Sequence, residues 1–203
     1  MVLDDRHLIE AKLDSQELLK GGFLHVFRDA VELPDGATTS REYVVHPGAV
    51  MIVPLIVDVS GEIRLVLERQ FRYPHGQVMI EFPAGKLNLG EDSHCCAQRE
   101  LQEETCYRAQ QWARAGVLHP NVSYSTEFID IWFARGLILG ERQLDAGEFL
   151  DVFSTTPTEF LRWCCDGRVT DGKTLSAALW LQNVLSGAWR LNWQGVAMSA
   201  NAG

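Results

Sequence analysis

The pattern of apolar and polar residues predicts a chain that begins with strands and then mixes strands with helices. Early strands are indicated at 8–13, 23–33 and 41–45, with a Pro-Asp-Gly turn at 34–36. The run 49–59 is almost continuously apolar, as expected of a buried central strand, and 62–71 alternates like its hairpin partner.

From residue 78 onward strands and helices are interleaved. Strands are predicted at 78–86, 112–118, 128–137 and 149–156, and helices at 93–105, 157–167 and 173–187. The last two helices end at Gly167 and Gly187, and Asp92 or Ser93 can cap the first helix.

This order of elements predicts an α+β fold of the α/β/α sandwich type. A mixed β-sheet with one central helix is expected, preceded by a small N-terminal antiparallel sheet. We expect an N-terminal β segment over 1–45, a main domain over 46–187 and a C-terminal tail over 188–203, where periodicity is weak.

Composition and charge exclude several classes of function. The net charge of −9 argues against nucleic-acid binding, because phosphate backbones require clustered Lys and Arg. The N-terminus does not have the pattern of a secretory signal, and no apolar run approaches the ~20 residues of a membrane span. Five cysteines, an odd number, do not form a disulfide framework. We therefore expect a cytoplasmic protein that binds neither nucleic acid nor membrane.

The segment RELQEETC, residues 99–106, is unusually acidic for a helix. At 100° per residue Glu100 and Glu104 share one face, and Glu103 flanks it. Arg99 can pair with Glu103, and Arg108 follows Glu104 by four positions, but nothing basic is expected to face Glu100. The helix alone leaves two interpretations open, a solvated acidic face or a site for a cation.

The spacing around this helix favours the cation site. Five residues separate Gly85 from Glu91, and seven more lead to Arg99-Glu100, an aliphatic residue, one further residue and Glu103-Glu104. This spacing resembles the Nudix hydrolase motif at each of its charged positions. One position departs from the motif, because Cys106 stands where the family has glycine. That glycine is expected to be a helix C-cap, so its loss should affect local stability more than metal binding.

The resemblance implies a site for Mg²⁺, with Mn²⁺ as an alternative, in a Nudix-like fold whose central helix is catalytic. Glu100 and Glu104 match the principal metal ligands, Glu103 an auxiliary one, and the Ala84 carbonyl a ligand from the preceding loop. Arg99 and Glu91 match residues that orient the helix and loop, and Gly85 is expected to allow a tight turn.

The flanking segments resemble the ADP-ribose pyrophosphatase branch of this family. Members of the branch hydrolyse ADP-sugars to AMP and a sugar phosphate, and they are typically homodimers in which N-terminal strands reach the partner's site. The resemblance assigns substrate binding to Arg69, Arg72, Glu81, Arg41 and Phe23. A surface role for the two strand arginines, a core role for Phe23 and a turn role for Arg41 stay open.

The branch's downstream Asp-Glu-x-Glu pattern, whose glutamates activate water and assist metal binding, is incomplete in this chain. The loop after residue 140 retains Glu148 but has Ala146 at the first glutamate. Glu148 is the favoured base, with Asp145, Glu103 and Glu127 as alternatives.

The resemblance leaves more than one function open. The first is hydrolysis of ADP-ribose or a related nucleoside diphosphate sugar. The second is the same chemistry on GDP-mannose, ADP-glucose, or a pyridine or flavin dinucleotide. The third is a non-catalytic ADP-ribose-sensing module, which predicts loss of motif carboxylates that this sequence keeps.

Overall fold

The structure is a computed structural model that describes residues 4–140 and 149–195, and its chain divides into two compact units. The N-terminal unit contains the residues up to Gly48 together with His119–Phe128. The main unit contains Ala49–Leu118 together with the residues from Ile129 onward. The domain boundaries predicted after residues 45 and 187 stay predictions.

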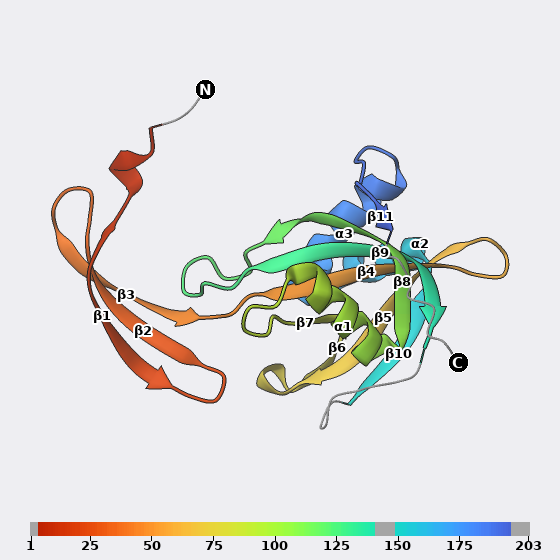
Figure 1. Cartoon of the computed structure of the whole chain (residues 1–203), viewed down its shortest axis with the longest axis horizontal. Coiled ribbons are helices and arrows are strands. Elements are labelled where there is room, and N and C mark those ends of the chain that lie inside the picture. The colour runs from red at the N-terminus through yellow and green to blue at the C-terminus, as the bar shows by residue number, and fades with distance from the viewer. Residues whose placement is uncertain (1–3, 141–148, 196–203) are drawn as a thin grey trace. The chain divides into compact units, whose positions relative to one another are not determined.

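The N-terminal unit contains a three-stranded antiparallel sheet, as predicted (Figure 1). After the short 3-10 helix η1 (Arg6–Leu8), its strands are β1 (Ala11–Lys20), β2 (His25–Glu32) and β3 (Thr38–Val45), in the order β1-β2-β3. The predicted turn forms with Gly36 at a φ of +85°. β1 runs seven residues beyond its predicted end, because pairing with β2 continues through the polar segment to Lys20 opposite His25.

The main unit is built on one mixed sheet. Its strands are β4 (Ala49–Val57), β5 (Ile63–Arg72), β6 (Gln77–Glu81), β7 (Ala84–Lys86), β8 (Tyr107–Leu118), β9 (Ile129–Leu139), β10 (Leu150–Thr155) and β11 (Gln194–Gly195). The order is β10-β5-β4-β9-β8-β11, with β6 paired to β5 and β7 to β4. β4 and β9 are parallel, and the other pairs are antiparallel. A 3-10 turn, η2 (Tyr73–His75), joins β5 to β6.

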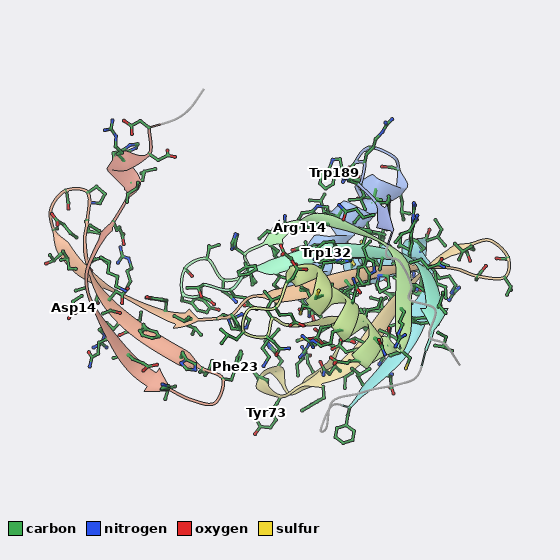
Figure 2. All side chains as sticks on the ribbon, viewed as in Figure 1. Asp14, Phe23, Tyr73, Arg114, Trp132 and Trp189 are labelled. Atoms are coloured by element: carbon green, nitrogen blue, oxygen red, sulfur yellow. The ribbon has the colours of Figure 1, made fainter. Side chains whose placement is uncertain are left out.

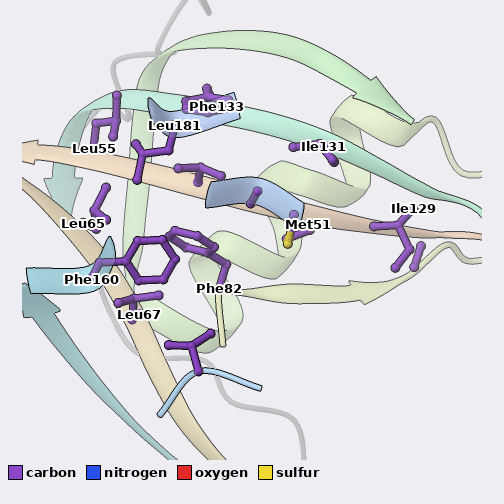
Figure 3. Packing of buried hydrophobic residues seen from close by; sticks show 14 residues of the cluster. Met51, Leu55, Leu65, Leu67, Phe82, Ile129, Ile131, Phe133, Phe160 and Leu181 are labelled. Atoms are coloured by element: carbon purple, nitrogen blue, oxygen red, sulfur yellow. The ribbon is translucent and has the colours of Figure 1, made fainter. Parts of the chain in front are cut away.

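Alternation along β4 places helices on both faces of this sheet. Val50 and Ile52 pack in one core cluster with Leu101 of α1 (Ser93–Thr105). Met51 packs in the other cluster with Phe160 and Leu181, which belong to α2 (Pro157–Cys165) and α3 (Gly172–Leu185) (Figure 3). A continuously apolar strand is therefore buried on both sides, and the predicted mixed sheet between helices is confirmed.

Helix α1 has the limits that the sequence predicts. The Asp92 side chain caps its N-terminus by accepting hydrogen bonds from the backbone N–H groups of His94 at 2.9 Å and Cys95 at 3.2 Å. Cys106 follows its last turn with φ at +67°, the one non-glycine residue with positive φ among those described. The position where the motif has glycine is thus a left-handed C-cap, as predicted.

Residues 188–195 are more ordered than the loose tail that weak periodicity predicts. The two-residue strand β11 pairs Gln194 with Trp112 of β8, and the Arg135 guanidinium lies 4.0 Å from the centre of the Trp193 ring. Trp189 packs edge-on against Trp180 of α3. Aromatic contacts order these residues. Contacts of this kind produce no helical or strand periodicity in the sequence, so the pattern of apolar residues did not predict them.

Two further expectations concern the whole chain. All five cysteines are free thiols, in agreement with the expected lack of a disulfide framework. Within the part of the chain that the structure describes, no helix is long and apolar enough to cross a membrane.

The left-handed backbone at Cys106 generates a stability prediction. Cys106→Gly is expected to raise the free energy of unfolding by about 0.5–1 kcal/mol, because removal of the Cβ clash outweighs the larger unfolded-state entropy of glycine. Urea unfolding followed by circular dichroism measures this difference. The matched control, Cys95→Gly inside the same helix, should instead be slightly destabilising. A loss of stability in Cys106→Gly would contradict the analysis.

Candidate active site

The acidic face of α1 carries three glutamates that the main unit holds in different ways. Arg99 Nη1 donates to Glu100 Oε1 at 2.7 Å and to Glu103 Oε2 at 2.9 Å. Glu104 is 3% exposed and accepts the backbone N–H of Ala84 at 3.0 Å. The helix therefore presents its carboxylates toward β7, where the motif begins.

Two expectations about charge on this helix were wrong. A basic group does face Glu100, because the long Arg99 side chain bends toward its own neighbour as well as toward Glu103. Arg108 does not pair with Glu104: it lies on β8, where its Nε donates to the Gln102 side chain at 3.0 Å. The helix ends at Thr105, so helical spacing no longer applies to Arg108.

Arg99 also joins the helix to the segment that precedes it. Its Nε and Nη2 donate to the two carboxylate oxygens of Glu91, both at 2.9 Å, and Nη2 reaches the Lys86 carbonyl at 3.1 Å. The hydrogen bonds from Arg99 lower the pKa of Glu91 to about 2, because they stabilise the charged form. Glu91 in turn accepts the Asn88 N–H at 2.9 Å. These hydrogen bonds supply a physical basis for the orienting roles of Arg99 and Glu91, and the roles themselves stay predictions.

Gly85 has a different role from the one predicted. No tight turn forms there: Gly85 lies in β7 opposite Val50, and its φ is outside the left-handed region. A Cβ at this position would overlap the carboxylate of Glu100. Glycine therefore leaves the space that the Glu100 carboxylate occupies, and a larger residue would have to displace that carboxylate.

The Ala84 backbone is fixed from both sides. The neighbouring Pro83 carbonyl accepts the Ile52 N–H at 2.9 Å, and Ala84 pairs with Met51 of β4. Its N–H contacts Glu104, while a metal-ligand role for its carbonyl stays a prediction.

The chemistry of these donors fits Mg²⁺. Carboxylates and a carbonyl are hard oxygen ligands, and Gly85 leaves room for the Glu100 carboxylate beside β7. Within residues 4–140 and 149–195, no three His, Cys, Asp or Glu side chains stand in a geometry that would hold an ion. Arg99 instead neutralises part of the acidic face. The residues are thus suitable in type, and their part as metal ligands stays a prediction.

A second charged cluster lies at the edge of the same sheet. The Arg72 guanidinium donates from Nε and Nη2 to the two oxygens of Glu81, at 2.7 and 2.8 Å. Lys173 Nζ donates to Glu81 as well and to Asp171 at 3.0 Å. The sequence indicated Arg72 and Glu81 but missed Lys173. Lys173 could have been identified by its position in the first turn of a predicted helix. The helix dipole disfavours a positive charge there unless an anion is near.

Of the other predicted binding residues, Arg69 lies on β5, and Arg41 and Phe23 belong to the N-terminal unit. Arg69 is three positions from Arg72 on one strand, so their side chains point to opposite faces, and Arg69 pairs with Asp151 at 3.8 Å. In the N-terminal unit, Arg41 lies on β3 rather than in a turn and pairs with Glu10. Phe23 is no core residue: it is 50% exposed at the end of the β1–β2 hairpin (Figure 2).

The favoured general base and its alternatives are not all among the described residues. Glu148, Ala146 and Asp145 lie outside the described residues. Glu103 is held by Arg99, and Glu127 belongs to the N-terminal unit, where its carboxylate is 3.9 Å from the His46 ring. All four candidate bases stay predictions.

Comparisons with known proteins agree with this arrangement. The model of the NUDIX domain matches residues 45–178, and the model of the nucleoside diphosphate sugar hydrolase N-terminal domain matches residues 10–44. A solved structure titled an ADP compounds hydrolase has the same fold, with a TM-score of 0.78 at 23% identity over 89% of this chain and 96% of its own.

Two curated relatives are similar over most of their length. A methanol dehydrogenase activator of Bacillus methanolicus is 36% identical over 85% of this chain and 92% of its own. An ADP-ribose pyrophosphatase of Bacillus subtilis (strain 168) is 32% identical over 87% of this chain and 95% of its own. With the motif carboxylates arranged around Arg99 as described, the chain belongs to the Nudix family and is a Nudix pyrophosphohydrolase similar to the ADP-ribose pyrophosphatases.

Proposed function

We propose that this protein hydrolyses the pyrophosphate bond of ADP-ribose, or of a related nucleoside diphosphate sugar, to a nucleoside monophosphate and a sugar phosphate. One observation carries the proposal: Arg99 holds Glu91, Glu100 and Glu103 together against the segment after β7. Such an acidic surface suits a substrate that arrives with a divalent cation, because the cation can neutralise carboxylates and phosphates together.

Glu100 and Glu104 are proposed as the principal Mg²⁺ ligands, with the Ala84 carbonyl and Glu103 as further ligands; Mn²⁺ can substitute. When bound, the ion would neutralise charge on the diphosphate oxygens and polarise the phosphorus that is attacked. Arg99 keeps the carboxylates in place before the ion binds, because it offsets their mutual repulsion. Glu148 is proposed as the general base.

Arg72 is proposed as the diphosphate-binding arginine. Glu81 fixes one edge of its guanidinium through Nε and Nη2. The side chain is 37% exposed, and among the described residues none accepts a hydrogen bond from Nη1. A planar guanidinium fixed on one edge can offer its remaining N–H donors to phosphate oxygens. Arg69, Arg41 and Phe23 are kept as proposed substrate contacts.

The preference for ADP-ribose rests on similarity and not on geometry. The match to a nucleoside diphosphate sugar hydrolase N-terminal domain and the similar ADP-ribose pyrophosphatases support it. A similar relative is named as a methanol dehydrogenase activator, so other substrates belong in the test. These are GDP-mannose, ADP-glucose, and pyridine and flavin dinucleotides.

We also propose that the protein is a homodimer formed through its N-terminal sheet. β1 is an edge strand whose residues are all exposed, and three leucines lie on it: Leu13, Leu18 and Leu19. An exposed edge with apolar side chains favours association, and a second copy of the same strand is its simplest partner.

The activity assay tests the proposed function directly. With Mg²⁺ or Mn²⁺ and the panel of nucleotides above, the protein is expected to release AMP and ribose 5-phosphate from ADP-ribose, identified by chromatography. Tight binding without turnover would support the sensing module, and turnover of another panel member alone would replace ADP-ribose as the substrate.

Glu104→Gln is expected to lower kcat by about 100-fold or more, because a neutral amide is a poor Mg²⁺ ligand. Its oxygen can still accept the Ala84 N–H, so stability should change by less than about 1 kcal/mol. Mg²⁺ should raise the Tm of the parent protein and have a smaller effect on the variant. Glu62→Gln, at an exposed position of the same unit, is the control. Unchanged kcat, or collapse of the fold, would count against the site.

Gly85→Ala tests the close approach of helix and strand. The added methyl must displace the Glu100 carboxylate, so we expect loss of the Mg²⁺-dependent rise in Tm and at least a tenfold loss of kcat/KM. Gly90→Ala is unsuitable as a control because its φ is +75°, whereas Gly172→Ala has open space and a permitted backbone. Normal Mg²⁺ binding by Gly85→Ala would show that its Cβ can be accommodated.

The double variant Leu13→Lys, Leu19→Lys is expected to be monomeric at micromolar concentration, because charge prevents burial of the β1 surface. Sedimentation equilibrium or light scattering gives the molecular mass. Leu179→Lys, an exposed leucine of α3, should leave the dimer intact. A monomeric parent protein would refute the dimer.

A further inference from the structure

A buried carboxylate with two cationic partners lies where β6 meets the start of α3. Glu81 is 1% exposed and receives Arg72 from β5 and Lys173 from α3. A buried charge is costly unless it is paired and hydrogen-bonded. Arg72 alone already pairs with both oxygens of Glu81, so the contact with Lys173 requires a further explanation.

The buried surroundings of Glu81 explain the need for a second cation. Its direct cross-strand partner is Glu68, which is fully buried on β5, so water does not solvate the charge of Glu81 on that side. Burial raises the pKa of Glu81, but the hydrogen bonds from Arg72 and the charge of Lys173 outweigh burial, so the pKa lies below its ordinary value. Lys173 therefore helps keep Glu81 an anion that can hold Arg72.

Lys173 occupies a position that helix stability alone would not favour. It lies in the first turn of α3, where the helix dipole disfavours a positive charge, and its side chain is only 13% exposed. Asp171, the N-cap of the same helix, accepts the Thr174 N–H at 2.9 Å and also pairs with Lys173. Asp171, the N-cap residue of α3, therefore helps hold the Lys173 side chain where it contacts Glu81.

Docking of α3 does not depend on the lysine alone. The Thr174 hydroxyl, fully buried, accepts the backbone N–H of Phe82 at 3.1 Å, next to Glu81 in the chain. Phe82 itself packs in the same core cluster as Leu181 of α3. The helix start is therefore attached to the end of β6 by a hydrogen bond and by packing, as well as by the ion pair.

We propose that Lys173 is a positioning residue for substrate diphosphate binding: it holds Glu81, and through Glu81 it sets the direction in which Arg72 presents its remaining donors. The proposal rests on the proposed function, because it takes Arg72 to bind the diphosphate. Lys173 does not contact the substrate in this account, and the order of contact is Lys173 to Glu81 to Arg72.

Kinetics on the whole 203-residue chain test this order of contact. Lys173→Met is expected to raise KM for the hydrolysed nucleotide sugar about tenfold, with kcat changed by less than about threefold. In an Arg72→Met background the same replacement should change KM by less than about twofold, because the two residues act on one contact. A full tenfold effect in that background, or an unchanged KM in the single variant, would overturn the proposal.

Three variants separate positioning from a merely structural role. Lys173→Arg keeps the charge and should restore KM to within about threefold of the parent value. Thr174→Val removes the hydrogen bond between α3 and Phe82, the residue after β6, and should lower Tm with KM unchanged. If Lys173→Met does not fold, Lys173→Gln replaces it, since an amide can donate to Glu81 without the charge. A raised KM in Thr174→Val equal to that of Lys173→Met would indicate a structural role only.

A measurement without turnover keeps this inference distinct from the proposed function. The Arg72 Nε–Hε signal, assigned by its loss in Arg72→Met, should be protected from solvent exchange in the ¹⁵N spectrum of the parent protein. Lys173→Met should accelerate that exchange about tenfold and weaken inorganic pyrophosphate binding by calorimetry. If the parent protein hydrolyses no nucleotide sugar, the proposed function fails and these two results alone decide the inference. Unchanged exchange overturns it whatever the activity.

Discussion

The structure of the site depends on how one guanidinium stabilises several carboxylates that repel each other. Glutamates on one face of α1 destabilise a helix, and burial of Glu104 adds to the cost. Arg99 offsets the repulsion with hydrogen bonds to Glu100 and Glu103, and its other edge is fixed by Glu91. Because Glu91 precedes the helix, the same arginine that neutralises the face also fixes the approach of the chain to it.

The alternation of side chains along the strands decides which residues meet on each face of the sheet. Alternation along β4 places α1 on one face and α2 with α3 on the other. On β5 and β6, the same alternation puts Glu68 and Glu81 opposite the face that contains Leu67 and Phe82. Lys173 belongs to a helix of the far face and reaches Glu81 at the β6 edge of the sheet. Residues of three elements therefore meet at one edge.

Much of helix α1 and its two ends could be predicted from the sequence, because the signals for them lie within a few consecutive residues. The limits of α1, the Asp92 cap and the left-handed position of Cys106 follow from capping rules. The Lys173–Glu81 contact joins residues 92 positions apart, and no local pattern encodes it. Gly85 was misassigned for a related reason: glycine before a helix usually indicates a turn, whereas here the space is needed by Glu100, which lies on another element.

The two charged clusters of the main unit bear on the electrostatic repulsion between an acidic protein and a negatively charged substrate. A chain of net charge −9 must bind a diphosphate, which is itself negative. In the proposed function, the acidic helix face would do so together with a divalent cation, since its carboxylates would otherwise repel the phosphates. Arg72 provides positive charge from the protein itself, but a long exposed arginine loses conformational entropy when it binds. Fixing it in advance on a buried anion reduces that loss, and Lys173 adds to Arg72 in keeping that anion charged against burial. If Arg72 binds the diphosphate as proposed, the position of Lys173 follows from the need to present it.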